Sequence, residues 1–138
     1  ISDWINQQIS GGVPTSEIGI FVRSEDELPR AKAAIIDAGQ NAFKITDKFE
    51  ENTGAISFGT MHLAKGLEFR SVAVMACDED ILPQQDRLER VTDASDLAEV
   101  YETERHLLYV ACTRAREHLL VTGVAPGSEF LEDLEQSK

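Results

Sequence analysis

Two short apolar runs, Ala55–Phe58 and Ser71–Ala76, place the strongest constraint on how this chain can fold. Runs this short and this apolar are typical of strands that are buried on both faces of a parallel sheet. The polar stretch between them, Thr60–Phe69, leaves the carboxyl end of a buried strand, which is where open α/β sheets hold their ligands. The sequence therefore predicts an α/β fold with a ligand site in this stretch.

The rest of the chain alternates strand and helix patterns. Further strands are predicted at Ile18–Val22, Ala42–Ile45 and His118–Thr122. Helices are predicted at Ser2–Ile9, from Ser24 to Gly39 and from Asp93 or Ser95 to about Arg114. Ser2 is expected as the N-cap of the first helix, and Ser24 with Glu27 as a capping box of the second. Tyr109 is expected in the core, on the apolar stripe of the long helix.

Composition excludes several classes of protein. The 138 residues predict one domain, and no apolar run approaches the ~20 residues of a membrane span, so no membrane contact is expected. The sequence shows no signal peptide, which predicts a cytoplasmic protein. Cys77 and Cys112 lack metal-type spacing, which predicts two buried free thiols and no metal site. The net charge of −12 is opposite to that of a protein that grips phosphates alone, so any nucleic-acid contact must be local or shared with a partner.

Two long motifs carry a resemblance to a known family. Thr60–Phe69 reads TMHLAKGLEF and Glu104–Gly123 reads ERHLLYVACTRAREHLLVTG. They resemble, in the same order, the fifth and sixth motifs of superfamily-1 DNA helicases of the UvrD/Rep/PcrA type. The resemblance runs from about Trp4 to Leu134. It implies a RecA-like, mostly parallel sheet with helices on both faces, acting as the second motor domain of an ATP-dependent DNA helicase that moves 3′ to 5′, with a role in DNA repair.

The resemblance also bears on domain organisation. Larger members of the family insert a subdomain where this chain has only the short polar link at residues 46–54. Residues 1–138 are therefore expected to form one C-terminal RecA-like domain of a compact variant. Because the chain begins with Ile1 rather than Met, it is expected to be part of a longer protein.

Three residues are implied to serve the nucleotide. Arg114 matches the family's arginine finger, whose guanidinium stabilises charge in phosphoryl transfer. Glu68 matches the glutamate that accepts from the ribose hydroxyls of ATP, and Gly66 is expected to permit a tight turn or close nucleotide approach. The alternatives are a surface arginine paired with Glu117 and a solvated turn carboxylate.

Contacts to single-stranded DNA are implied for Thr60 and His62, whose hydroxyl and imidazole can donate to backbone phosphates. Arg23, after the first strand, matches a family arginine near the DNA path. The alternative for His62 is a bond to nearby backbone, and Lys65 has a suitable charge but no assigned role.

The chain lacks the Gly-x-x-x-x-Gly-Lys-Ser/Thr phosphate loop. ATP and Mg²⁺ are therefore expected to be held mainly by an N-terminal RecA-like partner domain of the same polypeptide, and this chain alone is expected to be inactive. The alternatives are a non-catalytic RecA-like accessory or interaction module, and the helicase part of a helicase–nuclease.

Overall fold

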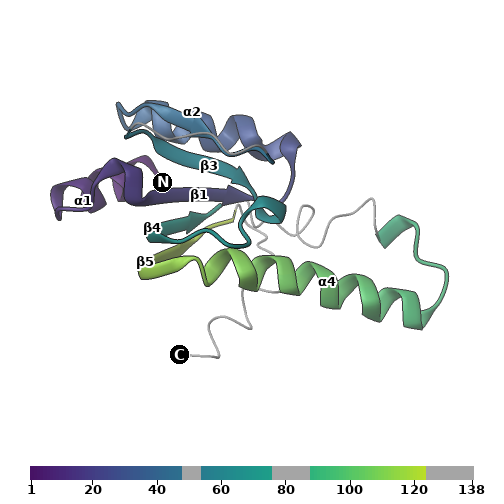
Figure 1. Ribbon diagram of the computed structural model, residues 1–138. Helices are drawn as coiled ribbons and strands as arrows, with labels where there is room; N and C mark the ends of the chain where they lie inside the picture. Colours follow the sequence, from purple (N-terminus) through teal and green to yellow (C-terminus); the bar gives the residue numbers. More distant parts are fainter. Residues whose placement is uncertain (48–53, 76–87, 124–138) are drawn as a thin grey trace.

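The computed structural model describes residues 1–47, 54–75 and 88–123, and they contain a five-stranded sheet of order β2-β3-β1-β4-β5 (Figure 1). All four strand pairings are parallel. The strands are β1 (Ile18–Val22), β2 (Ala42–Lys44), β3 (Ile56–Thr60), β4 (Phe69–Val74) and β5 (Ala115–Val121). The predicted α/β fold is confirmed.

Helices cover both faces of the sheet (Figure 1). The α-helices are α1 (Ser2–Ser10), α2 (Leu28–Asp37) and α4 (Ala94–Cys112). Among the described residues, short 3-10 helices are η1 (Thr15–Glu17), η2 (Glu25–Glu27) and η3 (Met61–Leu63). No helix of the described residues is long and apolar enough to cross a membrane.

The alternation of side chains along β1 divides the core into two halves. Ile20 and Val22 pack with α1 and α2, where Ile5 and Ile35 are fully buried. Phe21 points to the opposite face and packs with residues of α4 and η3. The sheet is therefore buried on both faces, as its short apolar strands predict.

One glycine of β1 permits close packing between neighbouring strands. A Cβ atom on Gly19 would lie 2.7 Å from the nearest ring carbon of Phe69 in β4. The Phe69 ring in turn meets the Phe21 ring edge-on, with 5.9 Å between the ring centroids. The absent side chain of Gly19 thus makes room for an aromatic pair on the α4 side of the sheet.

The predicted helix caps are partly wrong. Ser2 lies inside α1 rather than at its N-cap. Its hydroxyl donates to the Ala34 carbonyl at 2.9 Å, and this bond joins α1 to α2. Ser24 precedes η2, and its hydroxyl donates to the Glu27 carboxylate instead of capping backbone N–H groups. Asp93 is confirmed as the cap of α4, where its carboxylate accepts from the Asp96 N–H at 2.8 Å.

Two further expectations concern single side chains. Tyr109 was expected in the core but lies on the solvent side of α4, with 36% of its surface exposed. Cys112 is confirmed as a buried free thiol, and burial raises its pKa to about 11. Cys77 lies outside the described residues. Within those residues, no group of His, Cys, Asp and Glu side chains could hold a metal ion.

Candidate functional site

The residues predicted to contact DNA gather at the carboxyl edge of the sheet. Thr60 is the last residue of β3 and pairs with Val22, the last residue of β1. Arg23 follows β1 directly, and His62 follows Thr60 in η3 with its side chain exposed. The parallel register of β1 and β3 therefore brings Arg23, Thr60 and His62 together.

A cleft of about 540 Å³ opens at this edge. It is lined by Arg23, Ser24, Glu25, Lys44, Ile45, Thr46, Asp47, Thr60, His62 and Leu63. The lining comes from the ends of β1, β2 and β3, and it carries acidic as well as basic side chains. The cleft is thus a polar site at the position where parallel sheets hold ligands.

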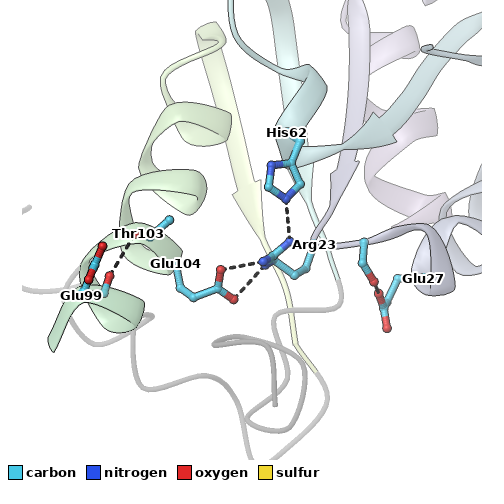
Figure 2. Close-up of polar contacts among 7 residues, drawn as sticks. Arg23, Glu27, His62, Glu99, Thr103 and Glu104 are labelled. Atoms are coloured by element: carbon cyan, nitrogen blue, oxygen red, sulfur yellow. Dashed lines mark hydrogen bonds and ion pairs between the residues drawn. The ribbon is translucent and has the colours of Figure 1, made fainter. Parts of the chain in front are cut away.

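Arg23, one of the residues that line this cleft, also forms a buried ion pair (Figure 2). Its Nε and Nη2 atoms donate to the two carboxylate oxygens of Glu104 in α4, at 2.9 and 2.6 Å. Its Nη1 atom lies 3.1 Å from Nε2 of His62. The Arg23 side chain is only 3% exposed, which argues against the direct DNA contact predicted for it.

Sequence reasoning missed Glu104, although a signal was available. Glu104 precedes Leu108 by four residues and Ala111 by seven, so it lies on the buried stripe of α4. An acidic residue on an apolar helical stripe is costly unless a partner compensates its charge. That pattern predicts a buried cation opposite α4, and the structure supplies Arg23 from 81 positions earlier in the chain.

The residues predicted to contact the nucleotide lie at the opposite edge. Glu68 directly precedes β4, and Arg114 directly precedes β5. The Phe69 N–H donates to the Arg114 carbonyl at 2.9 Å, so the two residues are brought together at the amino edge. The stretch Thr60–Phe69 crosses from the carboxyl edge to the amino edge, because the next strand is parallel, so its two ends lie at opposite edges of the sheet.

Gly66 makes the turn within this crossing. Its φ of +83° lies in the left-handed region, which confirms the tight turn expected of a glycine there. Lys65 and Glu68, on either side, are exposed. The carboxylate of Glu68 is thus accessible to a ligand at the amino edge.

Arg114 is half-buried, and its guanidinium is incompletely satisfied. Its Nη2 donates to the Thr113 hydroxyl at 3.1 Å, but its Nε is buried without a hydrogen-bond partner. Native proteins rarely leave a buried donor unpaired, and a guanidinium binds phosphate oxygens well. The unpaired Nε therefore fits an anionic ligand group at this edge.

The alternative pairing of Arg114 with Glu117 is wrong. Glu117 pairs with Arg70 of β4 instead, with 2.6 Å between Oε2 and Nε. The hydrogen bond from Arg70 lowers the pKa of the Glu117 carboxyl, and the same bond raises the pKa of Arg70. Arg116 pairs with Glu17 at 2.9 Å. Within the described part of the chain, Arg114 has no ion-pair partner of its own.

Comparisons with known proteins agree on one family. A model of the UvrD-like helicase C-terminal domain matches residues 24–125. The ATP-dependent DNA helicase PcrA of Leuconostoc citreum is 43% identical over 76 residues, which make up 55% of this chain and 9% of that protein. The ATP-dependent DNA helicase UvrD1 of Mycobacterium bovis is 33% identical over 98 residues, 63% of this chain and 12% of that protein.

A solved structure shares the fold. The C-terminal domain of a possible DNA helicase from Lactobacillus plantarum WCFS1 superposes with a TM-score of 0.63. The match covers 94% of this chain and 67% of that chain, at 23% sequence identity. This chain spans about a tenth of the length of the curated relatives it matches.

Proposed function

The chain belongs to the family of UvrD-like helicase C-terminal domains, and from this premise we propose that it acts as the second motor domain of an ATP-dependent DNA helicase or translocase. In this role it works with an N-terminal RecA-like domain that carries the phosphate loop and the Mg²⁺ ligands. ATP lies between the two domains and supplies the phosphoanhydride bond whose hydrolysis drives movement along single-stranded DNA, from 3′ to 5′.

The observation that carries the proposal is the state of Arg114 at the amino edge. Its buried Nε has no hydrogen-bond partner among the described residues, and Glu68 lies beside it through the Phe69–Arg114 backbone bond. Arg114 would act as an arginine finger, because its fixed positive charge stabilises the charge that develops on a transferring phosphoryl group. Glu68 would accept hydrogen bonds from the ribose hydroxyls.

The carboxyl-edge cleft would serve the DNA. Thr60, a residue that is 8% exposed, and the exposed His62 both line the polar cleft and carry hydrogen-bond donors, which suits contacts to the sugar–phosphate backbone without reading of base sequence. The two ligands would therefore occupy opposite edges of one sheet. This separation lets nucleotide and DNA bind to the same domain at the same time.

The test compares Arg114→Ala with Arg116→Ala in the complete helicase. Arg114→Ala is expected to leave ATP binding largely intact and to lower kcat steeply, since arginine fingers contribute roughly 10³- to 10⁵-fold in other phosphoryl-transfer systems. Arg114→Lys should recover little, because an ammonium group cannot reproduce the guanidinium fork. Arg116→Ala is the matched control and should lose only an exposed ion pair with Glu17. Parent-like hydrolysis by Arg114→Ala would exclude the arginine-finger role.

A further inference from the structure

Arg23, which lines the proposed DNA cleft, contacts His62 as well as its ion-pair partner Glu104. Figure 2 shows Arg23 between Glu104 and His62, with two bonds to the carboxylate and one to the imidazole. We propose that Arg23 and Glu104 form a clamp that fixes the tautomer and orientation of His62, so that Arg23 serves DNA binding through His62 and not by touching DNA. The inference rests on the proposed role of His62 as a DNA contact.

The chemistry of the guanidinium decides the tautomer. All its nitrogens carry protons and none can accept a hydrogen bond. Nε2 of His62, 3.1 Å from Nη1 of Arg23, must therefore be the acceptor and carry no proton. The single ring proton of the neutral imidazole then resides on Nδ1. In this tautomer Nδ1 is the N–H donor of the ring, and an N–H donor is the kind of group that binds a phosphate oxygen.

Glu104 is what holds the guanidinium in place. Its side chain is fully buried, and its two oxygens bind Nε and Nη2 of Arg23 in a bidentate arrangement. This fork fixes the plane of the guanidinium, so the remaining nitrogen, Nη1, has a defined direction toward His62. A lysine at position 23 would have one charged nitrogen and could not make this planar arrangement.

The clamp also predicts how DNA binding responds to salt. Arg23 and Glu104 carry opposite charges and are 3% and 0% exposed, so the pair is neutral and withdrawn from solvent. A direct phosphate contact by a cation releases counterions and contributes about 0.7 to the salt slope on single strands. Arg23 acting only through His62 contributes nothing to that slope.

The first experiment reads the ring nitrogens of His62 by ¹⁵N NMR in the 138-residue chain. The chain has three histidines, and a His62→Gln variant assigns the signals. At pH 8 the expected result is a protonated Nδ1 and an unprotonated Nε2. A protonated Nε2 in the parent chain overturns the proposal without the use of any clamp variant.

A paired substitution then removes the clamp. Arg23→Met with Glu104→Leu leaves the net charge unchanged, and replacement of both members of a buried ion pair by apolar residues is usually tolerated. In this clamp-less variant the His62 signals are expected to shift toward a mixture of tautomers. Unchanged nitrogen signals in a folded clamp-less variant would mean that Arg23 does not set the tautomer.

The second experiment measures single-stranded DNA affinity of the complete helicase over a range of salt concentrations. The clamp-less variant is expected to bind about 2- to 12-fold more weakly, the value of one net hydrogen bond, with an unchanged salt slope. Adding His62→Ala to it should weaken binding no further than His62→Ala alone. A salt slope that falls by about 0.7 would instead identify Arg23 as a direct contact.

The two experiments separate the clamp from the function on which it rests. If His62→Ala binds DNA like the parent while Nε2 is unprotonated, the clamp stands and the DNA role of His62 fails. If His62→Ala weakens binding while Nε2 is protonated, the DNA role stands and the clamp fails.

Discussion

Glu104→Leu should destabilise this domain more than almost any other change of a single charged residue. The carboxylate of Glu104 is fully buried and neutralises the guanidinium of Arg23, which is 3% exposed. Its removal takes the carboxylate acceptor of two hydrogen bonds, at 2.6 and 2.9 Å, away from a buried cation. Loss of one partner of a buried pair costs about 3–5 kcal/mol, a large share of the ~5–15 kcal/mol that stabilises a typical domain.

Urea unfolding of the 138-residue chain, followed by circular dichroism, measures this cost. A loss of about 3–5 kcal/mol corresponds to a fall of roughly 1–3 M in the midpoint at an m-value of about 1.5–3 kcal/mol/M. The matched control is Glu102→Leu, two positions earlier on the exposed side of α4, which should change the unfolding free energy by no more than about 0.5 kcal/mol.

The paired change Arg23→Met with Glu104→Leu identifies the cause of the loss. If the cost of Glu104→Leu comes from an uncompensated buried charge, removal of the charge as well should restore most of the lost stability. A double variant that is as unstable as Glu104→Leu would refute this reasoning, since packing would then explain the loss. The reasoning would also be refuted if the unfolding free energy of Glu104→Leu lay within about 1 kcal/mol of the parent value, because the pair would then be effectively solvated.

Two further predictions concern the core on the α4 side. Gly19→Ala should cost about 1–3 kcal/mol in unfolding free energy, because the new Cβ would lie 2.7 Å from the Phe69 ring. Adding Phe69→Leu to the same chain should relieve part of that cost. If the two substitutions lower the unfolding free energy additively, the clash is contradicted. Burial raises the pKa of Cys112 to about 11, so its thiol should react slowly with iodoacetamide. In a chain whose other cysteine is replaced by serine, the reaction at pH 8 should be about a hundredfold slower in the native state than in urea, and the native rate should rise about tenfold per pH unit up to pH 10. Equal native and unfolded rates would contradict the burial of Cys112.

Most of the sheet could be predicted from the sequence because its strands are short apolar runs. β1 was predicted with its observed bounds, Ile18–Val22, since the run is bounded by polar residues on both sides. β3 was predicted to end at Phe58 but continues to Thr60, because Gly59 and Thr60 pair with β1 in a register that only the partner strand defines. The strand order was not predictable, since no local pattern encodes which strands become neighbours.

The candidate site was also predictable only in part. The resemblance identified residues that the fold does collect at the two edges, because the motifs follow strands or helix ends. What the sequence alone did not reveal was that Thr60 and Glu68, eight positions apart, lie at opposite edges of the sheet. The burial of Arg23 could not be predicted, because its counterion lies 81 positions away in the chain. Long-range compensation of charge leaves no local pattern around the cation.

Helix α4 runs from the carboxyl edge to the amino edge of the sheet, which gives the domain a short rigid connection between them. Glu104 lies opposite the end of β1 at the carboxyl edge, and Arg114 follows the end of α4 at the amino edge. From Glu104 to Cys112 the helix rises about 12 Å, at 1.5 Å per residue. Leu108, fully buried between them, holds this segment against the sheet.

This connection limits how the proposed motor domain can move. A motion that displaced His62 from α4 would have to break the bond from Arg23 or the buried pair behind it, and breaking the pair costs several kcal/mol. Packed cores also resist continuous deformation. The domain therefore responds to a force at its carboxyl edge most cheaply by moving as one body, so that Arg114 at the amino edge moves with it. Rigid movement of this kind is what a pair of motor domains needs to open and close a shared nucleotide cleft.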